Sequence, residues 1–295
     1  MHPLIQQLIA QGPVVTDGAW GTELQRSGLG IGEFPDAWNL SHPERVAGVA
    51  SAYVSAGSQV ILTNTFGANR IRLGEHSLAQ RAMAINRAGV EISRRAALGR
   101  ACVFASIGPT GKMLMSGEIT QDEMLKAFQE QATALAKAGA DAIVVETMSD
   151  PAEAQLAVVA ALATNLPVVA CMVFDSGKDK DRTMMGTTPE EAAETLTAAA
   201  ADVIGANCGQ GISGFAAICK RLRAATDRPI WLKPNAGLPQ IVDGRTTYTT
   251  PPEEFARHVP ELIEAGASFI GGCCGTRPDF IQAITKILRE RPPAA

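Results

Sequence analysis

Eight short, almost continuously apolar runs recur along the 295-residue chain, and each is followed by a segment with a helical pattern. Their first residues lie 26 to 45 positions apart, about the size of one strand–helix unit. Strands that are apolar on both faces are typical of parallel sheets covered by helices. The predicted strands are Val14–Asp17, Gln59–Asn64, Cys102–Ile107, Ala142–Glu146, Val168–Phe174, Val203–Asn207, Ile230–Lys233 and Phe269–Gly272.

The segments between these runs predict amphipathic helices. The clearest cover Pro43–Gly57, Gln121–Gly139, Pro252–Gly266 and Pro278–Arg291, and Thr120 with Glu123 has the spacing of a capping box. A doubly wound sheet is the main alternative, but the first strand leads into DGAWG rather than a G-x-G-x-x-G turn. We therefore predict an α/β fold: a single eight-stranded parallel β/α barrel of the TIM type, forming one domain over residues 1–295.

Composition excludes several classes of protein. Apolar residues make up 46% of the chain, enough for a large core, and 26 basic against 30 acidic residues argue against nucleic acid as a partner. The longest apolar region, residues 156–174, is interrupted by Thr164, Asn165 and Pro167, so we expect no membrane span. The N-terminus does not resemble a secretory signal, and we expect a cytoplasmic protein with free thiols. The sequence is compatible both with a monomer and with a homo-oligomer.

Three of the six cysteines follow predicted strands. Cys208 ends the sixth strand, in Asn207–Cys208–Gly209, and Cys273 and Cys274 follow the eighth. Neighbouring strand ends of a barrel meet at one face, and three thiolates suit Zn²⁺ with one open coordination position. Two buried small residues, or a strained vicinal disulfide, are the alternatives for the adjacent pair. The remaining cysteines, 102, 171 and 219, fall inside predicted elements, where core packing is favoured.

Other polar residues also lie at predicted strand ends, where a β/α barrel places its chemistry. Asp17 and Glu146 are carboxylates that could hold the ammonium group of an amino acid, or serve as structural partners of amides or of an arginine. The candidate substrate-binding residues at these ends are Asp17, Gly18, Thr65, Phe66, Ser106, Glu146 and Asn235.

Seven phrases in a fixed order carry a family resemblance: DGAWGTELQ, TNTFGANR, GPTGK, ETMSD, GANCG, KPNAGLP and GGCCGT. Together they resemble the homocysteine S-methyltransferase family, zinc-dependent β/α barrels that methylate homocysteine to methionine. The resemblance implies Cys208, Cys273 and Cys274 as catalytic zinc ligands, with the homocysteine sulfur as the fourth. It implies that Asn235 can approach zinc when substrate is absent. Residues that match pocket positions for the amino-acid part are Asp17, Gly18, Thr65 and Glu146.

The subfamily decides the methyl donor. Several phrases resemble the homocysteine module of cobalamin-dependent methionine synthase, whereas PDAWNLSHPERV and RTMMGTTP resemble standalone bacterial betaine–homocysteine methyltransferases. Thr147 and Gly67 stand where the animal betaine enzymes carry tyrosines, so Trp20, Trp38 and Phe66 are the candidates for a cation-binding face. We expect a small onium donor, such as the quaternary ammonium compound glycine betaine or a sulfonium compound. The alternatives are a subunit served by a methylcorrinoid protein, an S-methylmethionine-dependent enzyme, and a thiol-redox protein.

Overall fold

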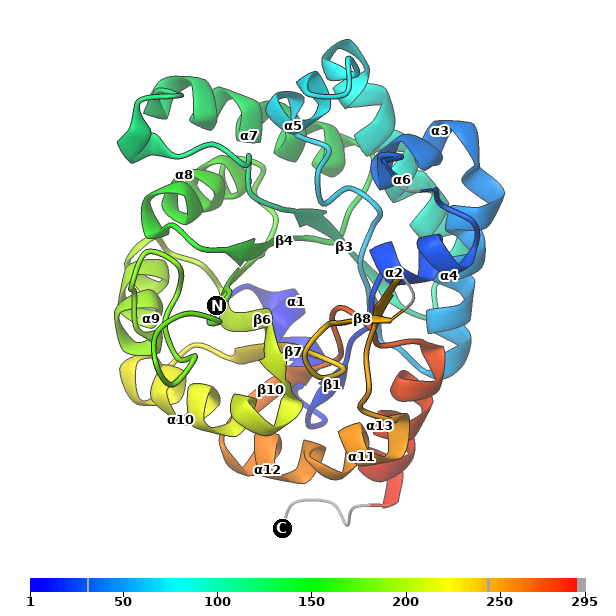
Figure 1. The fold of residues 1–295 in the computed structure, drawn as a ribbon, viewed down its shortest axis with the longest axis vertical. Helices are drawn as coiled ribbons and strands as arrows, with labels where there is room; N and C mark the ends of the chain where they lie inside the picture. Colours follow the sequence, from blue (N-terminus) through cyan, green and yellow to red (C-terminus); the bar gives the residue numbers. More distant parts are fainter. Residues whose placement is uncertain (31, 243–244, 291–295) are drawn as a thin grey trace.

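Eight parallel strands form a nearly closed barrel, seen end-on in Figure 1 with the helices ringed around it. The computed structural model describes residues 1–30, 32–242 and 245–290. The sheet runs in the order β1-β10-β7-β6-β5-β4-β3-β2, and Gln59 N donates to Val15 O at 2.8 Å where β1 and β2 meet. The strands are β1 (Val14–Val15), β2 (Val60–Ile61), β3 (Cys102–Ile107), β4 (Ala142–Met148), β5 (Val168–Met172), β6 (Val203–Gly211), β7 (Ile230–Asn235) and β10 (Ala267–Ile270). The predicted TIM-type barrel is confirmed.

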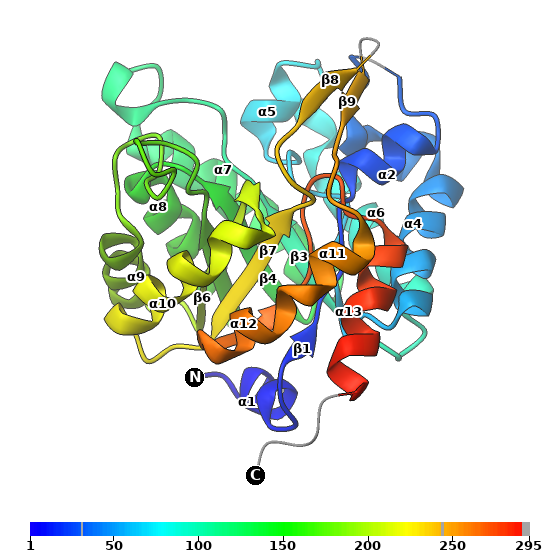
Figure 2. The same ribbon diagram turned by 60° about the horizontal axis from the view of Figure 1, so that its bottom comes forward.

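The helices between the strands cover the outside of the barrel, and α1 lies across its lower end (Figure 2). They are α1 (Pro3–Ile9), α2 (Gly21–Arg26), α3 (Trp38–Ser41), α4 (Pro43–Ala56), α5 (Arg70–Gly74), α6 (Ala82–Ala97), α7 (Gln121–Lys137), α8 (Pro151–Leu162), α9 (Pro189–Ala198), α10 (Phe215–Ala225), α11 (Pro252–Arg257), α12 (Val259–Glu264) and α13 (Pro278–Glu290). Short 3-10 turns lie in the connections: η1 (Pro35–Ala37), η2 (Ala79–Arg81), η3 (Leu114–Ser116) and η4 (Ile212–Gly214). The predicted capping box of Thr120 and Glu123 starts α7.

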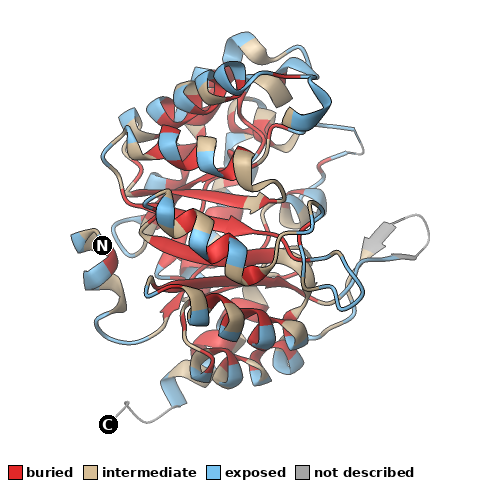
Figure 3. Cartoon of the chain, turned by 90° about the vertical axis from the view of Figure 1, so that its left-hand side faces the viewer, coloured by how far each residue is buried: buried red, intermediate tan, exposed pale blue. Residues whose placement is uncertain are grey.

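Alternate residues of each strand face the barrel interior and the helix layer. Phe104, Trp231 and Phe269 belong to the interior cluster, with ring centroids 6.1 Å apart for the first pair and 5.2 Å for the second. Ile5 of α1 joins this cluster. Figure 3 shows the consequence: the strands are buried, and the helices are exposed along their outer faces. The interior of the barrel is therefore a packed apolar core.

Several predicted boundaries are wrong. The stretch Pro252–Gly266 forms two helices, α11 and α12, because Pro260 cannot donate a hydrogen bond within a continuing helix. The strand predicted to end at Asp17 ends at Val15, whereas β4 and β6 run past Glu146 and Asn207. An unpredicted hairpin, β8 (Gln240–Val242) with β9 (Arg245–Thr247), projects above the barrel mouth (Figure 2). Among the described residues, no helix has the length and apolar character needed to cross a bilayer.

Candidate metal and substrate site

The period of two along the strands brings polar side chains together above the apolar interior. Phe104, Val144 and Trp231 lie inside the barrel. Two positions further toward the carboxyl ends of the same strands stand Ser106, Glu146 and Lys233. These three polar side chains are buried. Because side chains two apart share a face, a polar layer replaces the apolar one at the barrel mouth.

The sulfur atoms of Cys208, Cys273 and Cys274 lie within 4.8 Å of one another at this mouth. The Cys208 sulfur is 2.8 Å from that of Cys273 and 3.9 Å from that of Cys274. Hydrogen bonds from Cys208 and Cys273 lower the pKa of the Cys274 thiol, whereas the hydrogen bonds of Cys208 with Cys273 and Cys274 raise the pKa of Cys208. The convergence expected from strands six and eight is therefore present, and all six cysteines are free thiols. Cys171 and Cys219 are buried in the core, as predicted.

The backbone at two strand ends takes a conformation that side chains normally avoid. Thr147 in β4 and Cys208 in β6 both have a φ of 60°. The pairing register shifts between Val145 and Met148 in β4, and again between Cys208 and Gly211 in β6. A β-branched residue with positive φ is strained, and such strain persists only where the surroundings hold it.

The loop that carries the adjacent cysteines is held by the end of β7. Cys273 N donates to Pro234 O at 2.8 Å, and Ala236 N donates to Cys274 O at 3.0 Å. Gly275 follows with a φ of 82°, and a Cβ there would lie 2.2 Å from the Tyr248 ring. Glycine at 275 therefore lets the loop turn sharply and lets Tyr248 cover it.

The residues present fit a zinc ion. Three thiol sulfurs at this spacing form a donor set that zinc prefers, and they leave a fourth position open. Asn235 Nδ2 donates to Gly209 O at 2.9 Å, while its Oδ1 is buried without a hydrogen-bond partner. A buried carbonyl oxygen without a partner is costly, and a cation beside it would satisfy it.

A chain of hydrogen bonds joins the substrate-site candidates to the cysteines. Ser106 Oγ donates to Glu146 Oε1 at 2.5 Å, and Asn207 Nδ2 donates to Glu146 Oε2 at 3.3 Å. Burial raises the pKa of Glu146 to about 7, against the lowering effect of the nearby Lys233 charge. Ser106 and Glu146 therefore lie together beside the cysteines. Thr65 contacts this pair through the backbone of Ser106, because its hydroxyl donates to Ser106 O at 2.7 Å.

Asp17 is engaged in a different network, which contains a residue that the sequence analysis missed. Its Oδ1 forms an ion pair with Lys233 Nζ, and both side chains are buried. Its Oδ2 accepts hydrogen bonds from Trp20 Nε1 and Leu62 N, each at 2.7 Å. Asp17 thus has structural partners, one of them a backbone amide as in the alternative prediction, but its charged partner is a lysine and not an arginine. A lysine two positions after Trp231, on an inward-facing strand position, was the signal that could have revealed the pair.

The remaining predicted residues lie around the mouth. Gly18 is packed so closely that a Cβ would lie 2.8 Å from the Tyr53 ring. Phe66 is 41% exposed and its ring lies against Gly108. Trp38 is buried in the helix layer, and the Arg45 guanidinium lies 5.1 Å from its ring centroid. Trp38 is therefore occupied in packing, and the cation nearest its ring is the protein's own Arg45.

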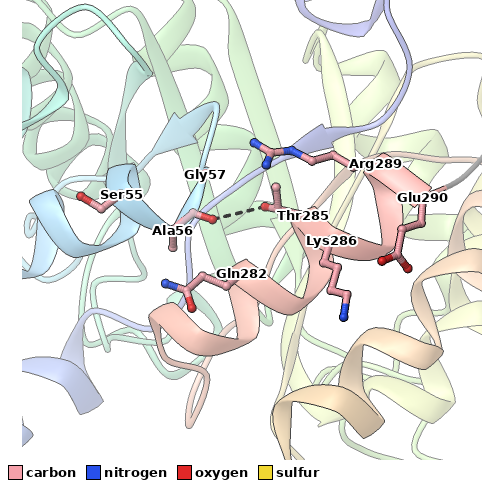
Figure 4. A pocket seen from close by; sticks show the side chains of 8 residues that line it. All are labelled: Ser55, Ala56, Gly57, Gln282, Thr285, Lys286, Arg289 and Glu290. Atoms are coloured by element: carbon pink, nitrogen blue, oxygen red, sulfur yellow. Dashed lines mark hydrogen bonds between the residues drawn. The ribbon is translucent and has the colours of Figure 1, made fainter.

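A groove of about 390 Å³ lies between the end of α4 and α13 (Figure 4). It is lined by Gly57, Gln282, Lys286 and Arg289 among others, and Thr285 Oγ1 donates to Ala56 O at 3.4 Å across its floor. Gly57 lies three residues before the start of β2, so the groove lies at the amino ends of the strands. The cysteines stand at the opposite, carboxyl ends.

Comparison with known proteins agrees with this geometry. The family model for homocysteine S-methyltransferase matches residues 14–288. The chain is 30% identical to the methionine synthase of Mycobacterium tuberculosis and 29% identical to that of Mycobacterium leprae, over 94% of its own length. It spans only about a quarter of the length of these relatives, 25% and 24%.

Solved structures show the same fold. The homocysteine methyltransferase MmuM of Escherichia coli superposes with a TM-score of 0.81 in its oxidized form, at 22% identity over 97% of this chain and 99% of that one. The metallated form of the same enzyme superposes with a TM-score of 0.80, at 23% identity over 97% of this chain and 100% of that one. Because the family model covers nearly the whole barrel, this chain belongs to the homocysteine S-methyltransferase family.

Proposed function

We propose that this protein is a zinc-dependent S-methyltransferase that transfers a methyl group to homocysteine and forms methionine. The observation that carries the proposal is the cluster of three thiol sulfurs within 4.8 Å at the mouth of the barrel. The family match and the metallated relative support the same assignment. Cys208, Cys273 and Cys274 would hold the zinc, with Asn235 Oδ1 beside them.

Zinc in such a site would bind the homocysteine sulfur and hold it as a thiolate at neutral pH. The protein orients the rest of the substrate. Glu146, buried beside the cysteines, is the carboxylate suited to the ammonium group, since Asp17 is already paired with the Lys233 charge, whereas the hydrogen-bond partners of Glu146 are neutral. Ser106 and Asn207 direct the two oxygens of Glu146. The barrel would hold acceptor and donor in a fixed mutual orientation, so that the sulfur meets a methyl carbon in line.

We propose a small onium compound, with glycine betaine first, as the methyl donor. The thiolate sulfur forms a bond to the methyl carbon as the carbon–nitrogen bond breaks, and the bonding pair leaves with a neutral tertiary amine. A cation would be favoured near three cysteine thiolates, whose charge exceeds that of one zinc ion. Phe66, exposed at the mouth, offers an aromatic face. S-methylmethionine, which would leave as a neutral thioether, fits the same reasoning.

A second candidate is a homocysteine-methylating subunit that takes its methyl group from a separate methylcorrinoid protein. The observation that favours it is the match to a quarter of two methionine synthases. In that case a free onium compound would not support turnover, and cobalt would be the leaving atom.

The test is methionine formation by reduced, zinc-loaded protein given homocysteine and, separately, glycine betaine, S-methylmethionine, a dimethylsulfonium compound and free methylcobalamin. A zinc-stripped aliquot is the control. Zinc-dependent product from one onium donor is the expected result and names the donor. Zinc bound without product from any onium donor contradicts the leading proposal and leaves the corrinoid subunit.

A further inference from the structure

Asn207 stands at the junction between the cysteine cluster and the carboxylate beside it. It is fully buried in β6, immediately before Cys208. Its side chain contacts two residues of β4 and one residue of the loop after β10. The proposed mechanism uses this amide only to direct Glu146, yet the amide also bonds Thr147 and lies near the Cys273 sulfur.

The Asn207 side chain forms hydrogen bonds with both the backbone nitrogen and the hydroxyl of Thr147. Asn207 Oδ1 accepts from Thr147 N at 2.7 Å, and Asn207 Nδ2 donates to Thr147 Oγ1 at 2.7 Å. Thr147 has the strained φ of 60°. Two short hydrogen bonds from one buried side chain are a physical reason for the strained conformation to persist, because an alternative backbone would leave buried polar atoms without partners.

The same nitrogen faces both halves of the site. It donates to Glu146 Oε2 at 3.3 Å, and it lies 3.9 Å from the Cys273 sulfur. Thr147 Oγ1 in turn lies 3.9 Å from the Cys208 sulfur. An amide N–H that points at a thiolate or carboxylate stabilises the charged form and orients it.

We propose that Asn207 is a positioning residue that couples the metal site to the substrate carboxylate. It holds Thr147 in its strained conformation, which places the end of β4 beside Cys208, and it orients Glu146 toward the bound amino acid. This inference rests on the proposed function only for the role of Glu146. The part that concerns zinc affinity stands on the cysteine cluster alone.

The experiment compares N207L with N86L as a matched control. Asn86 is equally buried and donates two 2.8 Å hydrogen bonds, but to the backbone carbonyls of Ala68, in the loop after β2, and of Ala82, at the start of α6. Three quantities are measured on each purified protein: the urea midpoint, the zinc dissociation constant by competition with a chromophoric chelator, and KM and kcat for homocysteine. Both variants are expected to lose stability. Only N207L is expected to bind zinc about 10- to 100-fold more weakly.

Two further variants separate positioning from general damage. T147G removes the strain, because glycine tolerates positive φ, so zinc affinity in N207L/T147G is expected to recover at least about threefold over N207L. N207D keeps the acceptor for Thr147 N but has no donor for Glu146. We expect N207D to raise KM for homocysteine by a larger factor than it raises the zinc dissociation constant. This variant replaces N207L in the experiment if N207L does not fold.

Wild-type zinc affinity in N207L, or an equal loss in N86L, would overturn the coupling role. Absence of recovery in N207L/T147G would overturn the part that concerns strain. Zinc affinity is measured without substrate, so a wild-type protein that binds zinc but makes no methionine would refute the proposed function and leave the test of Asn207 intact.

Discussion

The buried ion pair between Lys233 and Asp17 allows a quantitative prediction about stability. Lys233 is 2% exposed and Asp17 is 0% exposed, and the pair links β7 to the end of β1. Replacing Lys233 with methionine keeps the length of the side chain and removes its charge. Asp17 would then keep only the Trp20 and Leu62 hydrogen bonds, with its other oxygen buried and unpaired.

Breaking a buried pair from one side costs about 3 to 5 kcal/mol, so K233M is expected to be destabilised by that amount. D17N leaves the Lys233 charge buried without its partner, and we expect it to lower the free energy of unfolding by a similar amount. If the two effects were independent, the double variant would lose about 6 to 10 kcal/mol. An asparagine at position 17 can still accept from Trp20 and Leu62, and it has no charge to compensate. We therefore expect D17N/K233M to lose only about 3 kcal/mol or less.

Urea denaturation, followed by circular dichroism and tryptophan fluorescence at fixed zinc concentration, measures all four proteins. A double-mutant cycle gives the coupling free energy directly. A loss below about 1 kcal/mol in K233M would mean that the pair is effectively solvated. Additive losses in the double variant would refute the argument that the two charges compensate each other.

Three further predictions follow from particular contacts. Cys274→Ser should abolish both stoichiometric zinc, measured by atomic emission on the dialysed protein, and methionine formation; full activity would contradict the ligand assignment. Burial raises the pKa of Asp36 from 3.8 to about 7, so the folded state binds the extra proton and stability falls as pH rises through that window. D36N, which can still accept from Gly67 N, should therefore lose less stability between pH 5 and pH 8 than wild type, and equal pH profiles would refute this. Gly18→Ala places a Cβ 2.8 Å from the Tyr53 hydroxyl and 2.9 Å from Thr276 Oγ1. We therefore expect a thermal melt to show that the folded state is destabilised by about 1–3 kcal/mol. An unchanged melting temperature would show that Tyr53 moves freely.

The fold could be predicted from the sequence because each strand is buried on both faces and reads as an apolar run. The convergence of Cys208 with Cys273 and Cys274 followed from the same fact, since the carboxyl ends of neighbouring parallel strands share one face. Boundaries were less predictable. The break at His258 depends on Pro260, and the extension of β6 past Cys208 depends on a register shift that apolar periodicity does not encode.

The partners of the polar residues could not be read from the sequence. Asp17 and Glu146 are both carboxylates at strand ends, yet one is neutralised by Lys233 and the other faces Ser106 and Asn207. That difference arises from contacts between residues 40 to 216 positions apart. The alternation of inward-facing positions was visible in the sequence and would have placed Lys233 inside the barrel.

The most direct test of the central claim is X-ray absorption at the zinc edge, with and without homocysteine. It measures the number of sulfur neighbours independently of the methyl donor. We expect one zinc per chain with three sulfurs at about 2.3 Å, rising to four when homocysteine is added. A sulfur count that stays at three with saturating homocysteine would contradict the claim that this site activates the substrate thiol.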